Sequence, residues 1–266
     1  MTALLVDVGN TRIKWAPLDG GRLGRQRAAV FADWDVVEFA RKVFGTGRGV
    51  DRVLVSNVAG ARIARVLTLA AKHAGVPKPE FVSSRRTAAG VTTAYLEPWR
   101  LGVDRFVMAI AAHRLAKGRP ICVVGLGTTL TVDLVDAKGC HLGGAIVPGP
   151  RLMVDSVLQG TDGIRKRATG GDTGKRSLFS RTTRAAIEEG ALYSAAAMVD
   201  RAAEEAARLV GKRFLLVLTG GASPDVAPLV RSQHTVVQDL VLQGLAVLAE
   251  LGSADAWESR AARKPG

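Results

Sequence analysis

The sequence predicts an α/β protein made of two halves that share one architecture. Hydrophobic residues form 47% of the 266 residues but aromatic residues only 5%, so the core is expected to be built from aliphatic strands and helices. The pattern strand, Gly/Thr turn, strand, hairpin turn, third strand occurs at residues 4–24 and again at 122–143. A second pair of similar strands, at 52–59 and 215–222, follows in the same order, which indicates an internal duplication.

In the first half, the strand at 52–59 is followed by a predicted helix over 60–75. A further helix over 104–116 has apolar residues at a spacing close to 3.6 residues. The stretch Lys117-Gly118-Arg119-Pro120 then marks a boundary, because glycine and proline interrupt regular structure.

The second half adds three predicted helices after its strand–turn–strand unit. A long helix covers 182–210, a shorter one about 222–232, and a final one about 239–251. The predicted domains are therefore residues 1–117 and 118–266.

Composition narrows the classes of function. The chain carries 37 Lys and Arg against 24 Asp and Glu, a net charge of +13 that favours anionic partners such as phosphates. No compact basic motif or aromatic platform indicates nucleic-acid binding. Cys122 and Cys140 fit neither a disulfide framework nor a zinc site, and Asp7 interrupts any secretory signal. With no run of about 18 apolar residues, we expect a cytoplasmic protein with no membrane segment.

Two Gly/Thr loops, one in each half, are typical of phosphate binding, although either alone fits an ordinary β-turn. Glycine lets backbone N–H groups approach a phosphate, an aspartate at a strand end can hold Mg²⁺ directly or through water, and Lys14 can reach a transferring phosphoryl group. Opposed loops would clamp a polyphosphate between ribonuclease H-like halves, as in the actin–hexokinase–Hsp70 (ASKHA) ATPases. The loops are Asp7, Val8, Gly9, Asn10, Thr11 and Gly127, Thr128, Thr129.

Two further motifs leave alternatives open. Gly220 and Gly221 follow a buried strand and either admit an adenine or ribose against the backbone or form a plain strand-to-helix turn. Asp104 opens a helix and is either its N-terminal cap or a base facing a cleft, with Arg105 as an anion anchor.

A set of motifs in a fixed order spans residues 4–249. It comprises Asp7–Thr11, Tyr95 with Leu101–Arg105, Gly127–Thr129 with Asp133, Leu142–Pro150, Thr183–Gly190, Thr219–Gly221 and Leu242–Leu245. With these motifs the chain resembles the type III pantothenate kinases, a family related to the Bvg accessory factors.

The resemblance implies transfer of the ATP γ-phosphate to pantothenate, giving 4'-phosphopantothenate in the first step of coenzyme A synthesis. It also implies a homodimer and a catalytic base, Asp104, that accepts the hydroxyl proton. The implied pantothenate site is Tyr95, Gly102, Val103, Asp104, Arg105 and Thr183. The implied site for ATP with Mg²⁺ is Asp7, Val8, Gly9, Asn10, Thr11, Lys14, Gly127, Thr128, Thr129, Gly220 and Gly221, with Asp7 nearest the metal.

The chain departs from the family pattern at Gly125. The family has an aspartate there that binds a monovalent cation, K⁺ or NH₄⁺, and glycine offers no carboxylate. The cation is then held by other groups, or is not needed, or activity is reduced.

The segment 161–184 is rich in Lys, Arg and Gly and fits either a solvated loop or a lid over phosphates.

Two other functions are alternatives to a pantothenate kinase. A sugar or acetate-type kinase of the same superfamily would lack the combination of Tyr95 with Leu101–Arg105. A catalytically silent regulatory protein would account for Gly125, and its charge of +13 could serve DNA or a protein partner. The presence of all four expected site residues argues against it: Asp7, Asp104, Arg105 and Thr183.

Overall fold

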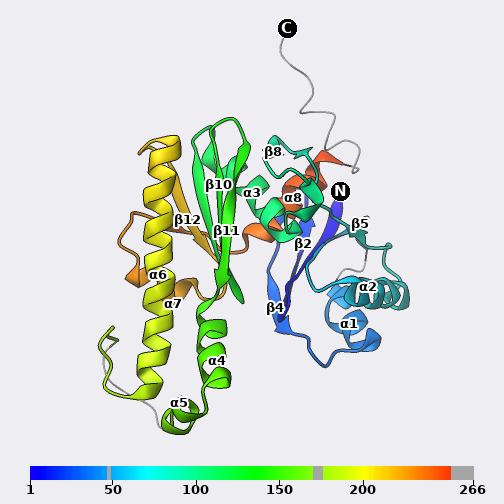
Figure 1. Cartoon of the computed structure of the whole chain (residues 1–266). Coiled ribbons are helices and arrows are strands. Elements are labelled where there is room, and N and C mark those ends of the chain that lie inside the picture. Colours follow the sequence, from blue (N-terminus) through cyan, green and yellow to red (C-terminus); the bar gives the residue numbers. More distant parts are fainter. Residues whose placement is uncertain (47–48, 170–175, 253–266) are drawn as a thin grey trace. The chain divides into compact units, whose positions relative to one another are not determined.

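The computed structural model describes residues 1–46, 49–169 and 176–252, and these form two compact units (Figure 1). Unit 1 comprises Met1–Gly118, Lys138–Leu142 and the chain from Asp239 onward, and unit 2 comprises Arg119–Ala137 and Gly143–Gln238. The chain thus first changes unit after Gly118, next to the sequence-based boundary. The final helix, which the prediction gave to the second half, belongs to unit 1.

The sheet of unit 1 has the strand order β3-β2-β1-β5-β6, with β4 beside β2. Central β1 runs antiparallel to β2 and parallel to β5. Residues 3–6 of β1 are all buried, as expected for a strand covered on both faces. The strands are β1 Thr2–Val8, β2 Arg12–Asp19, β3 Arg22–Leu23, β4 Arg27–Val30, β5 Arg52–Asn57 and β6 Glu80–Phe81.

Helices α1 (Val36–Lys42) and α2 (Ala61–Ala74) cover one face of this sheet and share a core with Val6, Phe39 and Leu67. Unit 1 also contains four short elements: η1 Phe44–Thr46, β7 Thr87–Ala88, β8 Val91–Thr93 and η2 Pro98–Arg100.

Helices α3 (Val103–Ala116) and α8 (Leu240–Leu251) pack against each other and against β5. A Cβ on Gly244 of α8 would lie 2.1 Å from the carbonyl oxygen of Val107, so only glycine permits this approach. The close contact explains why the final helix belongs to unit 1 although it follows unit 2 in sequence.

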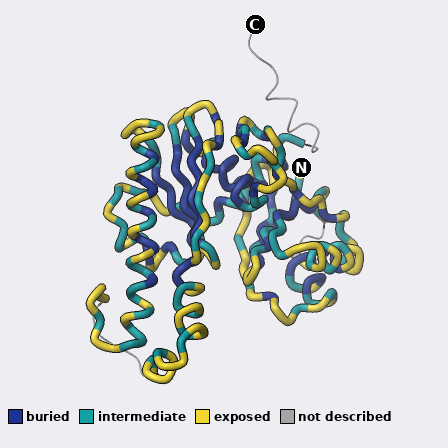
Figure 2. The backbone as a smooth tube through the Cα atoms, viewed as in Figure 1, coloured by how far each residue is buried: buried dark blue, intermediate teal, exposed yellow. Residues whose placement is uncertain are grey.

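The strands of unit 2 belong to a sheet with the order β13-β12-β9-β10-β11-β8-β7, in which β8 pairs with Cys140 and His141 of β11. Three of these strands, β9, β10 and β12, are largely buried (Figure 2), whereas alternate residues of β11 are exposed. The strands are β9 Ile121–Leu126, β10 Thr129–Val135, β11 Cys140–Pro148, β12 Leu215–Thr219 and β13 Thr235–Val236. The long helix α6 (Thr183–Val210) buries Ala195 and Val199 against the aliphatic side chains of β9 and β10.

The predicted helix over 222–232 is shorter in the structure. It consists of α7 (Ser223–Val226) and the 3₁₀ turn η3 (Ala227–Leu229). Pro224 lies in the first turn of α7, where proline is tolerated, and Pro228 prevents continuation of the helix because proline lacks an N–H and clashes with the preceding turn. The remaining helices of unit 2 are α4 Pro150–Gly160 and α5 Asp162–Arg167.

The two units repeat one strand order: β3-β2-β1-β5-β6 in unit 1 corresponds to β11-β10-β9-β12-β13 in unit 2. In both, the first strand pairs antiparallel with the second and parallel with the strand that follows a helix. The duplication predicted from the sequence is therefore present in the topology.

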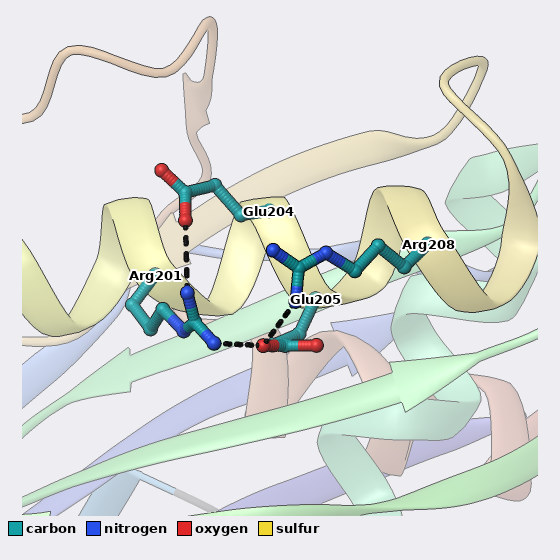
Figure 3. A network of polar contacts seen from close by, with 4 residues as sticks. All are labelled: Arg201, Glu204, Glu205 and Arg208. Atoms are coloured by element: carbon teal, nitrogen blue, oxygen red, sulfur yellow. Dashed lines mark hydrogen bonds and ion pairs between the residues drawn. The ribbon is translucent and has the colours of Figure 1, made fainter.

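Part of the positive charge is paired with carboxylates at the surface. On α6, Arg201 contacts Glu204 and Glu205, and Arg208 donates to Glu205 at 3.1 Å (Figure 3). These exposed pairs one turn apart contribute about 0.3–0.5 kcal/mol each, so they mark a solvated helix face. Residues 170–175 of the basic segment lie outside the described part. Among the described residues, no helix combines the length and the apolar character needed to cross a membrane.

Candidate functional site

Asp7 lies at the centre of the unit 1 sheet, near the carboxyl end of β1. In the strand register it is opposite Lys14 of β2 and opposite Ser56 of β5. Residues directly opposite in a sheet point to the same face, so Lys14 and Ser56 flank Asp7. The loop that follows is closed by a hydrogen bond of 3.0 Å from Gly9 N–H to the carbonyl of Arg12, and its Asn10 and Thr11 are exposed.

Asp239 is a member of this cluster that sequence reasoning missed. Its Oδ1 lies 3.1 Å from Nζ of Lys14. Asp239 directly precedes α8 and has a left-handed backbone with φ of 60°, a conformation that is uncommon outside glycine. In the sequence it resembles an ordinary helix cap, and only the return of α8 to unit 1 brings it to Lys14.

The electrostatics of the cluster centre on Asp7. Burial raises the pKa of the Asp7 carboxyl to about 7, against the lowering effect of Lys14 and with a further rise from Asp104 and Asp239. Asp7, Asp104 and Asp239 are therefore close enough for their charges to interact. A cation beside Asp7 would stabilise its ionised form.

This donor set fits Mg²⁺ held jointly by Asp7 and phosphate oxygens, the usual arrangement for this ion. Among the described residues, no group of three or more His, Cys, Asp and Glu side chains is arranged to hold a metal by itself.

Asp104 is the second residue of α3, and the N-cap of that helix is Gly102. The interpretation of Asp104 as the cap is therefore wrong. Its Oδ1 accepts a hydrogen bond of 2.8 Å from the backbone N–H of Arg105. A Cβ on Gly102 would lie 2.8 Å from the same oxygen, so the glycine leaves room for this carboxylate orientation.

Arg105 and Tyr95 form a second polar group in unit 1. Nη1 of Arg105 donates to the Tyr95 hydroxyl at 2.9 Å, and the Arg105 side chain is almost fully enclosed, at 3% exposure. The Tyr95 ring packs on His141, with ring centroids 5.8 Å apart. With Gly102, Val103 and Asp104 at the start of α3, unit 1 holds every predicted pantothenate residue except Thr183.

In unit 2, the predicted phosphate residues form a compact backbone turn. Gly127 N–H donates to the carbonyl of Thr129 at 3.0 Å, and Gly149 N–H donates to the carbonyl of Thr128 at 3.0 Å. A Cβ on Gly149 would lie 2.3 Å from the Gly127 carbonyl oxygen. Gly149, which the predicted site omits, is thus required by this close approach.

Gly220 lies against the same turn. Its φ is 104°, and a Cβ there would lie 2.5 Å from the carbonyl oxygen of Leu126, the residue before Gly127. Gly221 follows and is exposed. The structure thus brings both glycine motifs of unit 2 together.

Gly125 takes the place in unit 2 that Asp7 takes in unit 1. It is opposite Thr131 of β10 and Thr219 of β12, so hydroxyl groups replace the Lys14 and Ser56 that flank Asp7. The carboxylate next along this face of β10 is Asp133, which is 1% exposed and opposite Val123. The residues at the Gly125 position therefore do not supply a carboxylate ligand for a monovalent cation.

Thr183 is the first residue of α6 in unit 2, after the N-cap Thr182, whose Oγ1 accepts from Ala185 N–H at 3.2 Å. Tyr95 and Arg105 lie in unit 1, so neither unit alone assembles the full predicted pantothenate set.

Topology and loops together define a class of protein. Paired α/β units of one strand order, each with a Gly/Thr turn after its central strand, are the architecture of the actin–hexokinase–Hsp70 superfamily. A ROK family glucokinase from Streptomyces griseus has this fold, with a TM-score of 0.54 at 14% identity over 95% of this chain and 100% of its own. A Baf family protein from Campylobacter jejuni gives a TM-score of 0.55 at 18% identity, over 93% and 98%. The predicted fold class is confirmed.

Sequence comparison identifies the family within this class. The model of the family "Type III pantothenate kinase" matches residues 3–205. The type III pantothenate kinase of Nitrosococcus oceani is 37% identical over 93% of each chain, and that of Azoarcus sp. (strain BH72) is 38% identical over 95% of this chain and 92% of its own. The chain belongs to the type III pantothenate kinase family, and the function predicted from the sequence is confirmed.

Proposed function

We propose that this chain transfers the γ-phosphate of ATP to the primary hydroxyl of pantothenate, with its catalytic centre at Asp7, Lys14 and Asp104. One observation carries the assignment of the site. Lys14 is opposite Asp7 in the strand register and lies 3.1 Å from Asp239, and the charge of Asp104 contributes to the raised pKa of Asp7, so groups suited to a metal, a phosphoryl group and a hydroxyl proton lie in one cluster.

Each of these residues has a distinct task in the reaction. Phosphoryl transfer proceeds through a loose transition state, so positioning and charge neutralisation supply most of the catalysis. Asp104 accepts the proton of the attacking hydroxyl, and Lys14, held by Asp239, neutralises charge on the transferring group. Arg105 and Tyr95 bind the carboxylate end of pantothenate. When bound, Mg²⁺ neutralises phosphate charge beside Asp7.

The backbone turns hold the nucleotide phosphates. Glycine at positions 9, 127 and 220 lets main-chain N–H groups approach phosphate oxygens without hindrance from a side chain. Thr11 and Thr128 add hydroxyl groups at the same turns. We propose that Gly221 serves the nucleoside end of ATP.

The experiment that tests this function is a coupled ADP-release assay with MgATP and pantothenate, run in Na⁺, K⁺ and NH₄⁺ salts at equal ionic strength. We expect turnover that depends on pantothenate and is equal in all three salts, because Gly125 supplies no carboxylate for a monovalent cation. Absence of turnover from folded protein would contradict the kinase. Turnover that requires K⁺ or NH₄⁺ would contradict only cation independence.

We also propose that the chain is a homodimer in which β11 lies at the interface. Alternate residues of β11 are exposed along its whole length, and all of them are apolar or glycine apart from Cys140. Ile146 is 58% exposed, and Leu152 on the following helix α4 is 39% exposed. A continuous apolar strip of this kind is typical of a surface that a partner covers, and a second copy supplies a matching strip.

Charge placed on this strip is expected to separate the copies. Ile146→Glu should shift the protein from dimer to monomer, because a dimer would bury the two new carboxylates without partners. Light scattering after size exclusion measures the mass directly. Leu69→Glu, at a comparably exposed leucine on α2 with 55% exposure, serves as the control and should leave the mass unchanged. A dimer that persists in Ile146→Glu would place the interface elsewhere.

A further inference from the structure

The turn that carries Tyr95 is fixed by one side chain from outside the predicted site. Nη1 of Arg86 donates to the carbonyl oxygens of Thr93 at 3.0 Å and Tyr95 at 2.7 Å. Nη2 of the same guanidinium donates to the carbonyl of Leu96 at 2.9 Å. One cation therefore holds three main-chain carbonyls of the segment 93–96.

Backbone hydrogen bonds of Arg86 and side-chain contacts of Thr93 support this turn. The backbone carbonyl of Arg86 accepts a hydrogen bond of 3.0 Å from Thr93 N–H. Both the backbone and the side chain of Arg86 are therefore hydrogen-bonded to Thr93. Thr93 is 2% exposed, and its hydroxyl lies 3.3 Å from Nδ1 of His141 and accepts from Tyr95 N–H at 3.2 Å. Ala94 N–H donates to the carbonyl of His141 at 2.9 Å.

The turn that Arg86 fixes carries Tyr95, which in turn contacts Arg105. The Tyr95 hydroxyl accepts from Nη1 of Arg105, and the Tyr95 ring rests on His141. Hydrogen bonds from a charged guanidinium to carbonyls are stronger than neutral ones, so loss of Arg86 releases the turn and with it the hydroxyl that orients Arg105. We propose that Arg86 is a positioning residue of the pantothenate site, acting through Tyr95 on Arg105.

The proposal rests on the assignment of Tyr95 and Arg105 to pantothenate. Arg86→Gln is expected to raise the KM for pantothenate about tenfold, the effect of one charged hydrogen bond, while kcat and the KM for ATP change less than twofold. Arg86→Lys should be intermediate, because one ammonium cannot span the three carbonyls from two nitrogens. Arg65→Gln, at an exposed arginine of α2, controls for the loss of a positive charge and should leave all three constants unchanged.

A double-mutant cycle separates positioning from general structure. If Arg86 acts through Tyr95, Arg86→Gln in the background of Tyr95→Phe should change the pantothenate KM by less than twofold. Equal effects of Arg86→Gln in both backgrounds would overturn the proposal, as would an unchanged KM for pantothenate in the single variant.

Hydrogen exchange gives a readout that does not depend on catalysis. In Arg86→Gln the amides of Ala94 and Tyr95 are expected to exchange faster, while those of β1 keep their protection. Unchanged exchange at both amides would overturn the proposal even if the kinase assay succeeds. Faster exchange in a protein without pantothenate turnover would show that Arg86 fixes the turn and that the proposed function is wrong.

Discussion

Asp104→Asn is expected to lower kcat for pantothenate phosphorylation by about 10²–10⁴, the usual cost of losing a catalytic base. The amide keeps an oxygen that can accept the hydrogen bond of Arg105 N–H, so the start of α3 should be preserved. The asparagine side chain, however, cannot accept the proton of the pantothenate hydroxyl. Steady-state kinetics with pantothenate and ATP measure kcat, and equilibrium binding of MgATP measures nucleotide affinity, which should stay within about threefold of the unsubstituted protein.

The matched control is Asp33→Asn, which removes an exposed carboxylate after β4 and should leave kcat unchanged. If Asp104→Asn turned over at a near-normal rate, the base would have to be another group. A loss of MgATP affinity equal to the loss of kcat would instead assign Asp104 to nucleotide binding.

Asp7→Asn is expected to abolish turnover and, at the same time, to stabilise the fold at neutral pH. Burial raises the Asp7 pKa from 3.8 to about 7, so the folded protein favours the protonated carboxyl. The contribution of Asp7 to stability is therefore fully present below pH 3.8 and is lost as pH rises through 7. Asparagine is neutral throughout. The free energy of unfolding of Asp7→Asn should exceed that of the unsubstituted protein only slightly near pH 4, and by at most about 4 kcal/mol at pH 8.

Urea unfolding at several pH values, without nucleotide, measures this difference. Asp51→Asn is a control whose effect on stability should depend on pH in the opposite direction. Hydrogen bonds from Thr2 lower the pKa of the exposed Asp51 carboxyl. Asp51 thus stabilises the fold at neutral pH, and this contribution is lost as pH falls through its folded pKa. A constant difference between Asp7→Asn and the unsubstituted protein across this range would show that Asp7 does not carry the burial cost.

The cost of burying Asp7 has a functional reason. A carboxylate held in a desolvated position without a cation is poorly stable, but the same position is favourable once a metal and phosphates are bound. The stability gain and the activity loss of Asp7→Asn are expected together, because both follow from the same desolvated carboxylate.

The sequence by itself determined the local elements and the motifs. The helices over 104–116 and 182–210 and the repeated strand–turn–strand units follow from periodicity and turn residues, which are properties of neighbouring residues. The loop Asp7–Thr11 and the pair Asp104-Arg105 can also be recognised from the sequence, because their functional groups come from consecutive residues.

The tertiary structure decided which distant residues join those motifs. Asp239 reaches Lys14 across 225 positions of sequence because Gly244 lets α8 pack on α3. Arg86 reaches the Tyr95 turn because its guanidinium can span three carbonyls, a geometry that no local pattern encodes. That Asp104 is not the cap of α3 is likewise a matter of backbone geometry, since α3 begins one residue earlier, with Gly102 as its cap. Contacts of this kind depend on the packing of whole elements, so they come only with the fold.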